Sequence, residues 1–275
     1  MLMLKDLSKK FSKKLSTRLA MRKHPLKPRW DYFNEHSATI PAAISLIESA
    51  PEHHLRDINF LENELIPALG LNDENLNEQP KELEKFFGTG LHVFQYPNQL
   101  ARYMVWLADH AHDAQTYVEI GSRWGGTFIL VTQWLLRIGA PLNSVVAIDP
   151  IGETPLLQVY GNHLSAQGVR YQFVRNSSTS PEIKSLFASL RPDFVFIDGD
   201  HSLIGALADH MLARQSANII VHHDVSSDAC PETTALWNAL KDLEAHVFTA
   251  TEFTEQYLSV EGSFLGIGVL KRKAL

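Results

Sequence analysis

Runs of apolar residues alternate with helical segments through the second half of the chain. Stretches rich in Val, Ile, Tyr and Phe predict strands at 117–121, 144–149, 171–176, 193–198 and 218–224. The segments between these strands predict helices near 125–138, 154–167, 181–190 and 202–214. Strands that alternate with helices form a parallel sheet with right-handed crossovers. The pattern therefore predicts a doubly wound α/β domain.

This predicted sheet has one helix before it and two strands after it. Pro97 is placed to begin a helix that runs through LARYMVWLADHAH. After the fifth strand, a helix around Thr233–Leu243 precedes two further predicted strands, HVFTAT (246–251) and FLGIGVLK (264–271). We place the domain at residues 91–275.

Residues 31–90 are predicted to be helical and polar. Apolar residues recur with helical spacing at Ile40–Ser49 and Leu55–Leu69, and the turn-rich acidic stretch LGLNDENLNEQPKELEK connects them to the sheet domain. No residue pattern in this region indicates chemistry. We interpret it as an auxiliary helical layer or cap.

The first 30 residues predict a basic amphipathic helix. Apolar residues lie on one face at three- and four-residue steps: Leu4, Leu7, Phe11, Leu15 and Leu19. The pattern ends near His24-Pro25, because proline disfavours helical backbone in the residue before it. Charges interrupt every turn, so the segment is not a secretory signal. Four interpretations stay open for this apolar face and the basic residues around it. The helix could pack on residues 31–275 or on a second subunit, lie on an anionic membrane surface, contact nucleic acid, or serve as an address for an organelle.

The charge of the chain is unevenly distributed. Residues 1–30 carry ten basic side chains against one acid, a net +9, whereas the 275-residue chain as a whole carries −6, which leaves −15 for residues 31–275. An acidic body is not expected to bind nucleic acid. The single cysteine, Cys230, cannot form an internal disulfide, and no apolar run approaches the roughly 18 residues that span a bilayer. We expect a cytoplasmic protein, compatible with a homo-oligomer and with peripheral attachment to the inner membrane surface through residues 1–30.

Candidate ligand-binding residues follow the first two predicted strands, where ligands bind in open α/β sheets. The first strand leads into Glu119-Ile-Gly121-Ser-Arg-Trp-Gly125-Gly126, whose glycines allow close approach of a ligand to a helix start. The G-x-G-x-x-G spacing of dinucleotide enzymes is absent. Asp149, 28 residues beyond Gly121, can accept hydrogen bonds from two ribose hydroxyls. A structural glycine turn and a helix-capping Asp149 are the alternative readings.

Titratable residues follow the fourth and fifth predicted strands. The fourth strand ends in Asp198-Gly-Asp200-His201-Ser202, and the fifth ends in His222-His223-Asp224. Carboxylate and imidazole groups on neighbouring strand ends can bind a divalent cation, and His201 could accept a proton near neutral pH. Alternatively, Asp200 or Ser202 caps a helix and His222 packs within the sheet, which is the reading that we favour for His222.

These motifs together resemble a known family. VEIGSRWGGTF, VVAIDP, FVFIDGDHS and IIVHHDV, in this order and spacing, are similar to class I S-adenosylmethionine-dependent methyltransferases. The resemblance is greatest to the branch of cephalosporin-biosynthesis methyltransferase-like proteins and macrolide-sugar O-methyltransferases, and it covers roughly residues 90–275. It implies a seven-stranded, Rossmann-like sheet with one antiparallel strand and S-adenosylmethionine across the carboxyl ends of the strands.

The resemblance also assigns roles to individual residues. Glu119, Gly121 and Ser122 would line the methionine part of the cofactor, and Asp149 would hold the ribose. Ser177 or Ser178, after the third strand, would lie near the adenine, and Asp198 would also belong to the cofactor-binding residues.

The magnesium-dependent members of this branch suggest a metal site. They carry an acid after the fourth strand and an acidic pair after the fifth, where this chain has Asp198, His223 and Asp224. Histidine in the third position disfavours Mg²⁺ relative to a softer divalent ion such as Mn²⁺, because Mg²⁺ prefers oxygen ligands. His201, three residues after Asp198, matches the position of the general base in these enzymes.

We therefore expect an O-methyltransferase that acts on a hydroxylated small molecule or a glycan sugar. Asp198 and His201 would be its catalytic residues. Two alternatives stay open: an NAD-dependent oxidoreductase, which would use the same fold and Asp149, and a degenerate methyltransferase domain that acts as a membrane-tethered scaffold.

Overall fold

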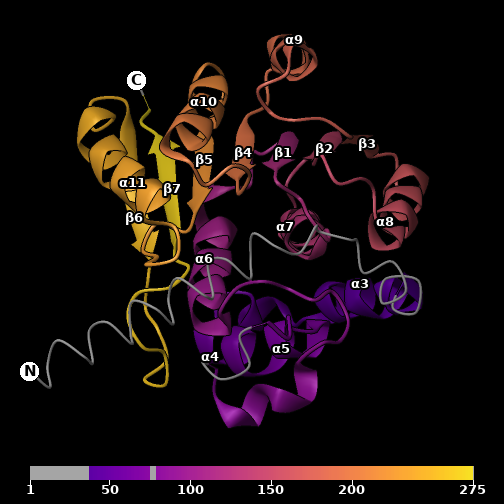
Figure 1. The fold of residues 1–275 in the computed structure, drawn as a ribbon. Coiled ribbons are helices and arrows are strands. Elements are labelled where there is room, and N and C mark those ends of the chain that lie inside the picture. Colours follow the sequence, from indigo (N-terminus) through magenta and orange to yellow (C-terminus); the bar gives the residue numbers. More distant parts are fainter. Residues whose placement is uncertain (1–36, 75–78, 275) are drawn as a thin grey trace, which may run out of the picture.

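The centre of the computed structural model, which describes residues 37–74 and 79–274, is a seven-stranded sheet (Figure 1). The strands lie in the order β3-β2-β1-β4-β5-β7-β6, and β7 alone runs in the direction opposite to the other six. Their bounds are β1 Thr116–Ile120, β2 Ser144–Ile148, β3 Arg170–Val174, β4 Phe194–Ile197, β5 Ile219–His223, β6 Phe248–Phe253 and β7 Ile267–Arg272. The predicted doubly wound α/β fold is confirmed.

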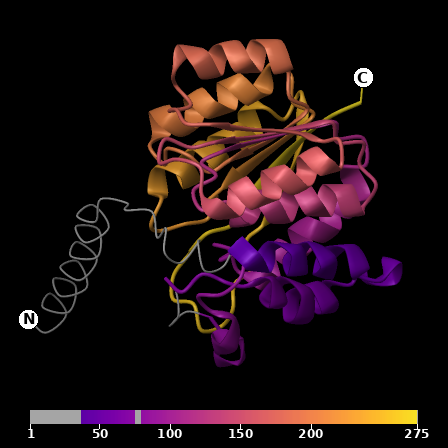
Figure 2. The same ribbon diagram turned by 90° about the vertical axis from the view of Figure 1, so that its right-hand side faces the viewer.

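Helices cover both faces of the sheet (Figure 2). One face packs on α6 (Pro97–His110), α7 (Gly126–Arg137) and α8 (Pro155–Ala166), and the other on α9 (Pro181–Leu190), α10 (Leu203–Arg214) and α11 (Pro231–Leu243). Successive side chains of a strand point to opposite faces. In β2, accordingly, Val145 joins the core on the α6–α8 side, whereas Val146 joins the core on the α9–α11 side.

A further helical layer lies outside α6, α7 and α8 (Figure 2). Its elements are η1 Ser37–Thr39, α3 Ile40–Ser49, η2 Glu52–His54, α4 Ile58–Phe60, the π-turn η3 Leu61–Leu65, α5 Ile66–Leu69 and η4 Lys81–Phe86. Ile40, Ile47 and Leu65 belong to the same buried core as Phe128 and Trp134 of α7, so these helices share the core of the sheet domain. The helix predicted at Ile40–Ser49 has these same bounds.

Local signals explain where the helices start. Ser202 precedes α10, and its Oγ accepts a hydrogen bond from the Gly205 N–H at 3.1 Å, which is the capping role considered for it. Ser180 and Thr154 cap α9 and α8 in the same way. Proline at the first helical position favours helix initiation at α6, α8, α9 and α11.

The two last strands begin later than the sequence pattern indicates. β6 starts at Phe248 rather than at residue 246, because the turn that ends α11 continues to Val247, whose N–H bonds to the Glu244 carbonyl at 2.9 Å. β7 starts at Ile267 rather than at residue 264, because Leu265 and Gly266 have φ of 62° and 95°, which do not fit a strand.

The predicted amphipathic helix at residues 1–30 lies outside the residues that the structure describes. Within residues 37–74 and 79–274, no helix is long and apolar enough to cross a membrane.

Candidate active site

The glycine turn after β1 is packed tightly against the ends of β2 and β4. Gly121 has φ of 85°, and its N–H donates to the Ile148 carbonyl at 2.8 Å. A Cβ on Gly121 would lie 2.0 Å from the Asp198 carbonyl oxygen. Gly125, the N-cap of α7, has φ of 91°, and a Cβ there would lie 2.5 Å from Leu157 Cγ. Only glycine fits at these two positions, so the turn has a structural requirement in addition to any role in ligand binding.

Asp149 connects the turns that follow β1 and β2. Its Oδ2 accepts the Arg123 N–H at 2.8 Å, and its Oδ1 accepts the Ile151 N–H at 2.7 Å. Burial raises the pKa of Asp149, while these two N–H groups lower it again in part. Each carboxylate oxygen can accept a second hydrogen bond. Asp149 does not cap a helix, because Thr154 is the N-cap of α8. Its side chain instead joins the two turns and keeps the capacity to bind a hydroxyl pair.

Glu119 lies buried in β1, beside the same group of side chains. The Tyr117 hydroxyl donates to its Oε2 at 2.5 Å. Burial raises the pKa of Glu119 to about 8; the Tyr117 hydroxyl opposes this rise, and the negative charge of Asp198 adds to it. Glu119 is thus mostly protonated at neutral pH and adds little negative charge to the site. The neighbouring Ser122 is also buried, and its hydroxyl has no hydrogen-bond partner among residues 37–74 and 79–274.

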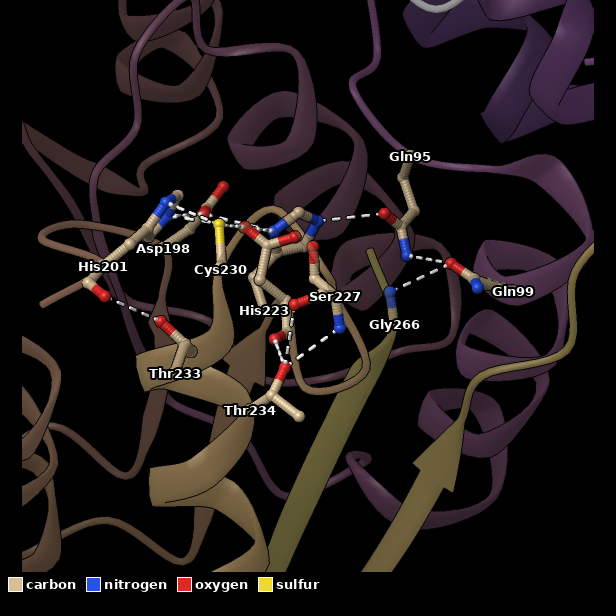
Figure 3. Close-up of polar contacts among 11 residues, drawn as sticks. Gln95, Gln99, Asp198, His201, His223, Ser227, Cys230, Thr233, Thr234 and Gly266 are labelled. Atoms are coloured by element: carbon tan, nitrogen blue, oxygen red, sulfur yellow. Dashed lines mark hydrogen bonds and ion pairs between the residues drawn. The ribbon is translucent and has the colours of Figure 1, made fainter. Parts of the chain in front are cut away.

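Two carboxylates and two imidazoles meet at the ends of β4 and β5 (Figure 3). His201 Nε2 lies 3.2 Å from Asp198 Oδ1 and 3.6 Å from Asp224 Oδ2. His223 Nδ1 lies 3.2 Å from the same Asp198 oxygen and 3.5 Å from the same Asp224 oxygen. The side chain of His201 is 43% exposed, whereas those of His223 and Asp224 are buried. The structure therefore brings these four sequence-predicted residues together.

The carboxylates and imidazoles of this cluster shift the pKa values of one another. Burial would raise the pKa of Asp198, but His223 and His201 outweigh it and hold that pKa below its usual range. The hydrogen bond to Asp198 raises the pKa of His201 to about 11, and Asp198 and Asp224 raise that of His223 to about 10 in spite of burial. Protonation of both imidazoles would neutralise the two carboxylates. A divalent cation could replace the two protons, because metal binding releases protons from its ligands.

A chain of amide groups fixes the other nitrogen of His223 (Figure 3). His223 Nε2 lies 2.9 Å from Gln95 Oε1, so this nitrogen carries the proton that it donates. Gln95 Nε2 in turn donates to Gln99 Oε1 at 2.9 Å, which also accepts the Gly266 N–H at 3.2 Å. A hydrogen bond to the distal nitrogen orients a metal-binding histidine. Sequence reasoning missed Gln95; its place in the FQYPNQ segment before α6 was the available signal.

The start of α11 holds the loops that carry the acids and His201. Thr234 Oγ1 donates to the Asp224 carbonyl at 3.2 Å, and Thr233 Oγ1 donates to the His201 carbonyl at 3.2 Å. Asp224 itself has φ of 57°, an uncommon backbone conformation for a residue other than glycine. Cys230, which precedes α11, also contacts His201 and Asp224. Sequence analysis gave none of these three α11 residues a role in the site.

Ser177 and Ser178 lie on the separate loop after β3. Ser177 is exposed, and its Oγ lies 2.9 Å from Thr179 Oγ1. Ser178 is buried beside Asp209 of α10; burial raises the pKa of Asp209 to about 6, and the Ser178 hydroxyl opposes this rise. His222, on β5, packs inside the protein against His210 and Trp237, as the sequence reading favoured.

The donor groups at β4 and β5 fit a divalent cation. Single ligand atoms from Asp198, His223 and Asp224 lie within 4.8 Å of one another. His223 Nδ1 is buried near the two carboxylates, and its contact with Asp198 Oδ1 at 3.2 Å does not have the geometry of a hydrogen bond. Two carboxylates and one imidazole suit Mn²⁺ or a softer ion better than Mg²⁺.

No protein-family model matches the chain, and no curated protein does. Solved structures with a similar fold include cofactor-bound Rv0187 from MTB, at 23% identity and a TM-score of 0.44 over 64% of this chain and 81% of that one. The O-methyltransferase TomG from Streptomyces achromogenes, in complex with SAM, has 16% identity and a TM-score of 0.42 over 66% and 82% of the two chains. An O-methyltransferase from Bacillus cereus, in complex with SAH, has 16% identity and a TM-score of 0.41 over 87% and 100%. rRNA methylases are also among the similar structures. A shared fold at such identities does not determine function.

Proposed function

We propose that the chain is an S-adenosylmethionine-dependent methyltransferase that methylates a hydroxyl oxygen of a small molecule or a glycan sugar. The observation that carries this proposal is the convergence of three turns at the carboxyl ends of β1, β2 and β4. Gly121 packs against the Asp198 backbone, and Asp149 bonds to the Arg123 N–H, so the three turns form one edge of the sheet. Ligands of doubly wound sheets bind at such an edge.

The residues of this edge suit the cofactor. Asp149 would accept the ribose hydroxyls, Gly121 and Ser122 would line the methionine part, and Ser178 would border the adenine. The buried, unpartnered Ser122 hydroxyl supports this arrangement, because an unsatisfied buried polar group calls for a partner. When bound, S-adenosylmethionine supplies a methyl group on a positively charged sulfur that leaves readily. The protein must then align the acceptor oxygen and remove its proton.

We assign the removal of that proton to His201. Its side chain is half-exposed and can reach a ligand, and Asp198 orients its ring. While no metal ion is bound to the two carboxylates, the hydrogen bond to Asp198 and the charges of Asp198 and Asp224 raise the pKa of His201. His201 can therefore accept a proton only when another positive charge balances Asp198 and Asp224. This requirement supports a divalent cation held by Asp198, His223 and Asp224, which would also acidify a bound hydroxyl.

An open hollow beside the cluster offers polar groups to a hydroxylated acceptor. Its volume is about 380 Å³, and its lining combines the apolar Pro231 and Ala235 with hydroxyl, amide and carboxylate side chains: Ser226, Ser227, Asp228, Thr234, Asn238 and Ser263. It borders the site, since Thr234 bonds to the Asp224 backbone. Hydroxyl and amide groups can both donate to and accept from the hydroxyls of a sugar.

Calorimetric titration with S-adenosylhomocysteine and with NAD⁺ tests the proposal. We expect the wild-type chain to bind S-adenosylhomocysteine and not NAD⁺. The variant Asp149→Ala should bind S-adenosylhomocysteine at least about tenfold more weakly, a loss of about 1.4 kcal/mol. Asp113→Ala, which removes an exposed aspartate before the start of β1, is the matched control and should change the affinity less. Unchanged affinity in Asp149→Ala would refute the assignment of the cofactor site, and binding of NAD⁺ alone would favour an oxidoreductase.

A further inference from the structure

Cys230 joins two members of the cluster at β4 and β5 to form a second group of side chains that could hold a metal ion (Figure 3). Its members are His201, Asp224 and Cys230, and one ligand atom from each lies within 4.8 Å of the others. Cys230 Sγ is 3.3 Å from His201 Nδ1 and 3.2 Å from Asp224 Oδ2. Asp224 is thus common to this group and to the group formed with Asp198 and His223.

The two separations that involve sulfur in this group are close to those around one zinc ion. With Zn–S bonds of about 2.3 Å and Zn–N or Zn–O bonds of about 2.0–2.2 Å, tetrahedral ligand atoms stand about 3.4–3.6 Å apart. The two sulfur contacts, at 3.3 and 3.2 Å, are within about 0.4 Å of that spacing. Sulfur, nitrogen and oxygen donors together select zinc-like ions, whereas Mg²⁺ takes oxygen ligands.

Two features of the surroundings indicate that the contacts among His201, Asp224 and Cys230 are not accidental. Cys230 Sγ and the buried His223 Nδ1 both lie near Asp224 Oδ2, at 3.2 and 3.5 Å, so donors from the two groups converge on one carboxylate oxygen. The threonine hydroxyls at the start of α11 hold the backbones of His201 and Asp224. His201 is half-exposed and Cys230 is partly exposed, so an ion can enter from solvent.

We propose that His201, Asp224 and Cys230 bind a zinc-class ion, with a fourth position left for water. The Cys230 thiol, which now donates to Asp224, would release its proton to solvent and bind as a thiolate. An ion on His201 would also remove the proton acceptor of the proposed methyl transfer. Zinc would therefore inhibit that reaction, a consequence that rests on the proposed function, whereas the binding itself does not.

Titration of the full, metal-free chain with Co²⁺ tests the site directly, because a cobalt–thiolate bond gives an intense charge-transfer absorption in the near ultraviolet. Cys230 is the one cysteine of the chain, so such a band can arise only from this residue. We expect the band to grow as Co²⁺ is added until it corresponds to one cobalt–thiolate bond per chain, and we expect Zn²⁺ to abolish it. Absence of the band in the wild-type chain would overturn the proposal, and this readout does not require a variant to fold.

Competition with a chromophoric chelator then measures the affinity for Zn²⁺. Cys230→Ser and His201→Gln should each weaken zinc binding at least about tenfold, since the loss of even an outer partner of a metal costs about that much. His112→Gln, which removes an exposed histidine elsewhere, should bind Zn²⁺ like the wild type. Equal zinc affinity in Cys230→Ser and wild type would overturn the proposal. Failure of S-adenosylhomocysteine to bind would refute the proposed function instead and leave these metal measurements unaffected.

Discussion

Substitution of Gly121 by alanine probes the packing that joins the turns of the site. Gly121→Ala places a Cβ 2.0 Å from the Asp198 carbonyl oxygen and 2.7 Å from the Gly199 Cα, both of them backbone atoms that cannot rotate away. Gly139, at the end of α7, has nearly the same φ, 83° against 85°, but a Cβ there meets nothing within 4 Å. Gly139→Ala is therefore a matched control that isolates the backbone conformation from the clash.

The two variants should differ in magnitude. Alanine in the left-handed region costs about 1–2 kcal/mol, which both variants share. Overpacking adds about 1–3 kcal/mol in Gly121→Ala. Movement of the two turns away from this clash also strains the hydrogen bonds from the Gly121 N–H to Ile148 and from the Asp198 N–H to Ile120. Each of these bonds is 2.8 Å long and contributes about 0.5–1.5 kcal/mol. We expect the free energy of unfolding to fall by about 1–2 kcal/mol in Gly139→Ala and by about 3–5 kcal/mol in Gly121→Ala.

Urea denaturation followed by circular dichroism measures these free energies, and calorimetry measures the affinity for S-adenosylhomocysteine. A displaced Asp198 turn should also weaken ligand binding in Gly121→Ala, whereas Gly139→Ala should bind normally. If the two variants lose the same stability within about 0.5 kcal/mol, the tight contact between the β1 and β4 turns is not present in the protein.

Three further predictions concern other parts of the chain. Burial raises the pKa of Asp209 to about 6, above its value in the unfolded chain, so ionisation of Asp209 destabilises the native state as pH rises from about 4 through 6. The free energy of unfolding of Asp209→Asn, measured relative to wild type, should therefore be about 2–3 kcal/mol higher at pH 7.5 than at pH 4. If urea denaturation gives the same difference between the two proteins at both pH values, the prediction is wrong. Gln95→Leu removes the hydrogen-bond acceptor of His223 Nε2 and should lower the affinity for Mn²⁺ about tenfold or more in calorimetry. An unchanged affinity would show that the hydrogen bond from His223 to Gln95 does not contribute to cation binding. The full chain should co-sediment with anionic vesicles at low salt and detach above roughly 0.5 M, where the Debye length is below ~5 Å, whereas a chain without residues 1–30 should stay in solution. Unfolding of that truncated chain would instead assign the apolar stripe to the core.

The parts of the site that follow strand ends could be predicted from the sequence. Parallel strands bring their carboxyl ends to one edge, so Asp198, His201 and Asp224 were expected to meet once the strands were recognised. The bounds of these strands depend on local patterns, and the structure reproduces them within one or two residues for β1 to β5.

Contacts that depend on packing between distant segments could not be predicted. Gln95 meets His223 across 128 residues, and the meeting requires the turn before α6 to lie against the end of β5. Cys230 looked like an isolated cysteine, because only the placement of the α11 start brings it to His201. The protonation of Glu119 likewise follows from burial beside Tyr117, which periodicity alone does not quantify.

A crystal structure of the chain soaked with S-adenosylhomocysteine tests the central claim most directly. We expect the ligand across the carboxyl ends of β1 and β2, with its ribose hydroxyls on the Asp149 carboxylate and its sulfur toward Asp198 and His201. Binding of the ligand elsewhere would contradict the assignment of this edge as a methyl-transfer site. The same conclusion would follow if the edge held no ligand at a saturating concentration and Asp149 kept only its hydrogen bonds to the Arg123 and Ile151 N–H groups.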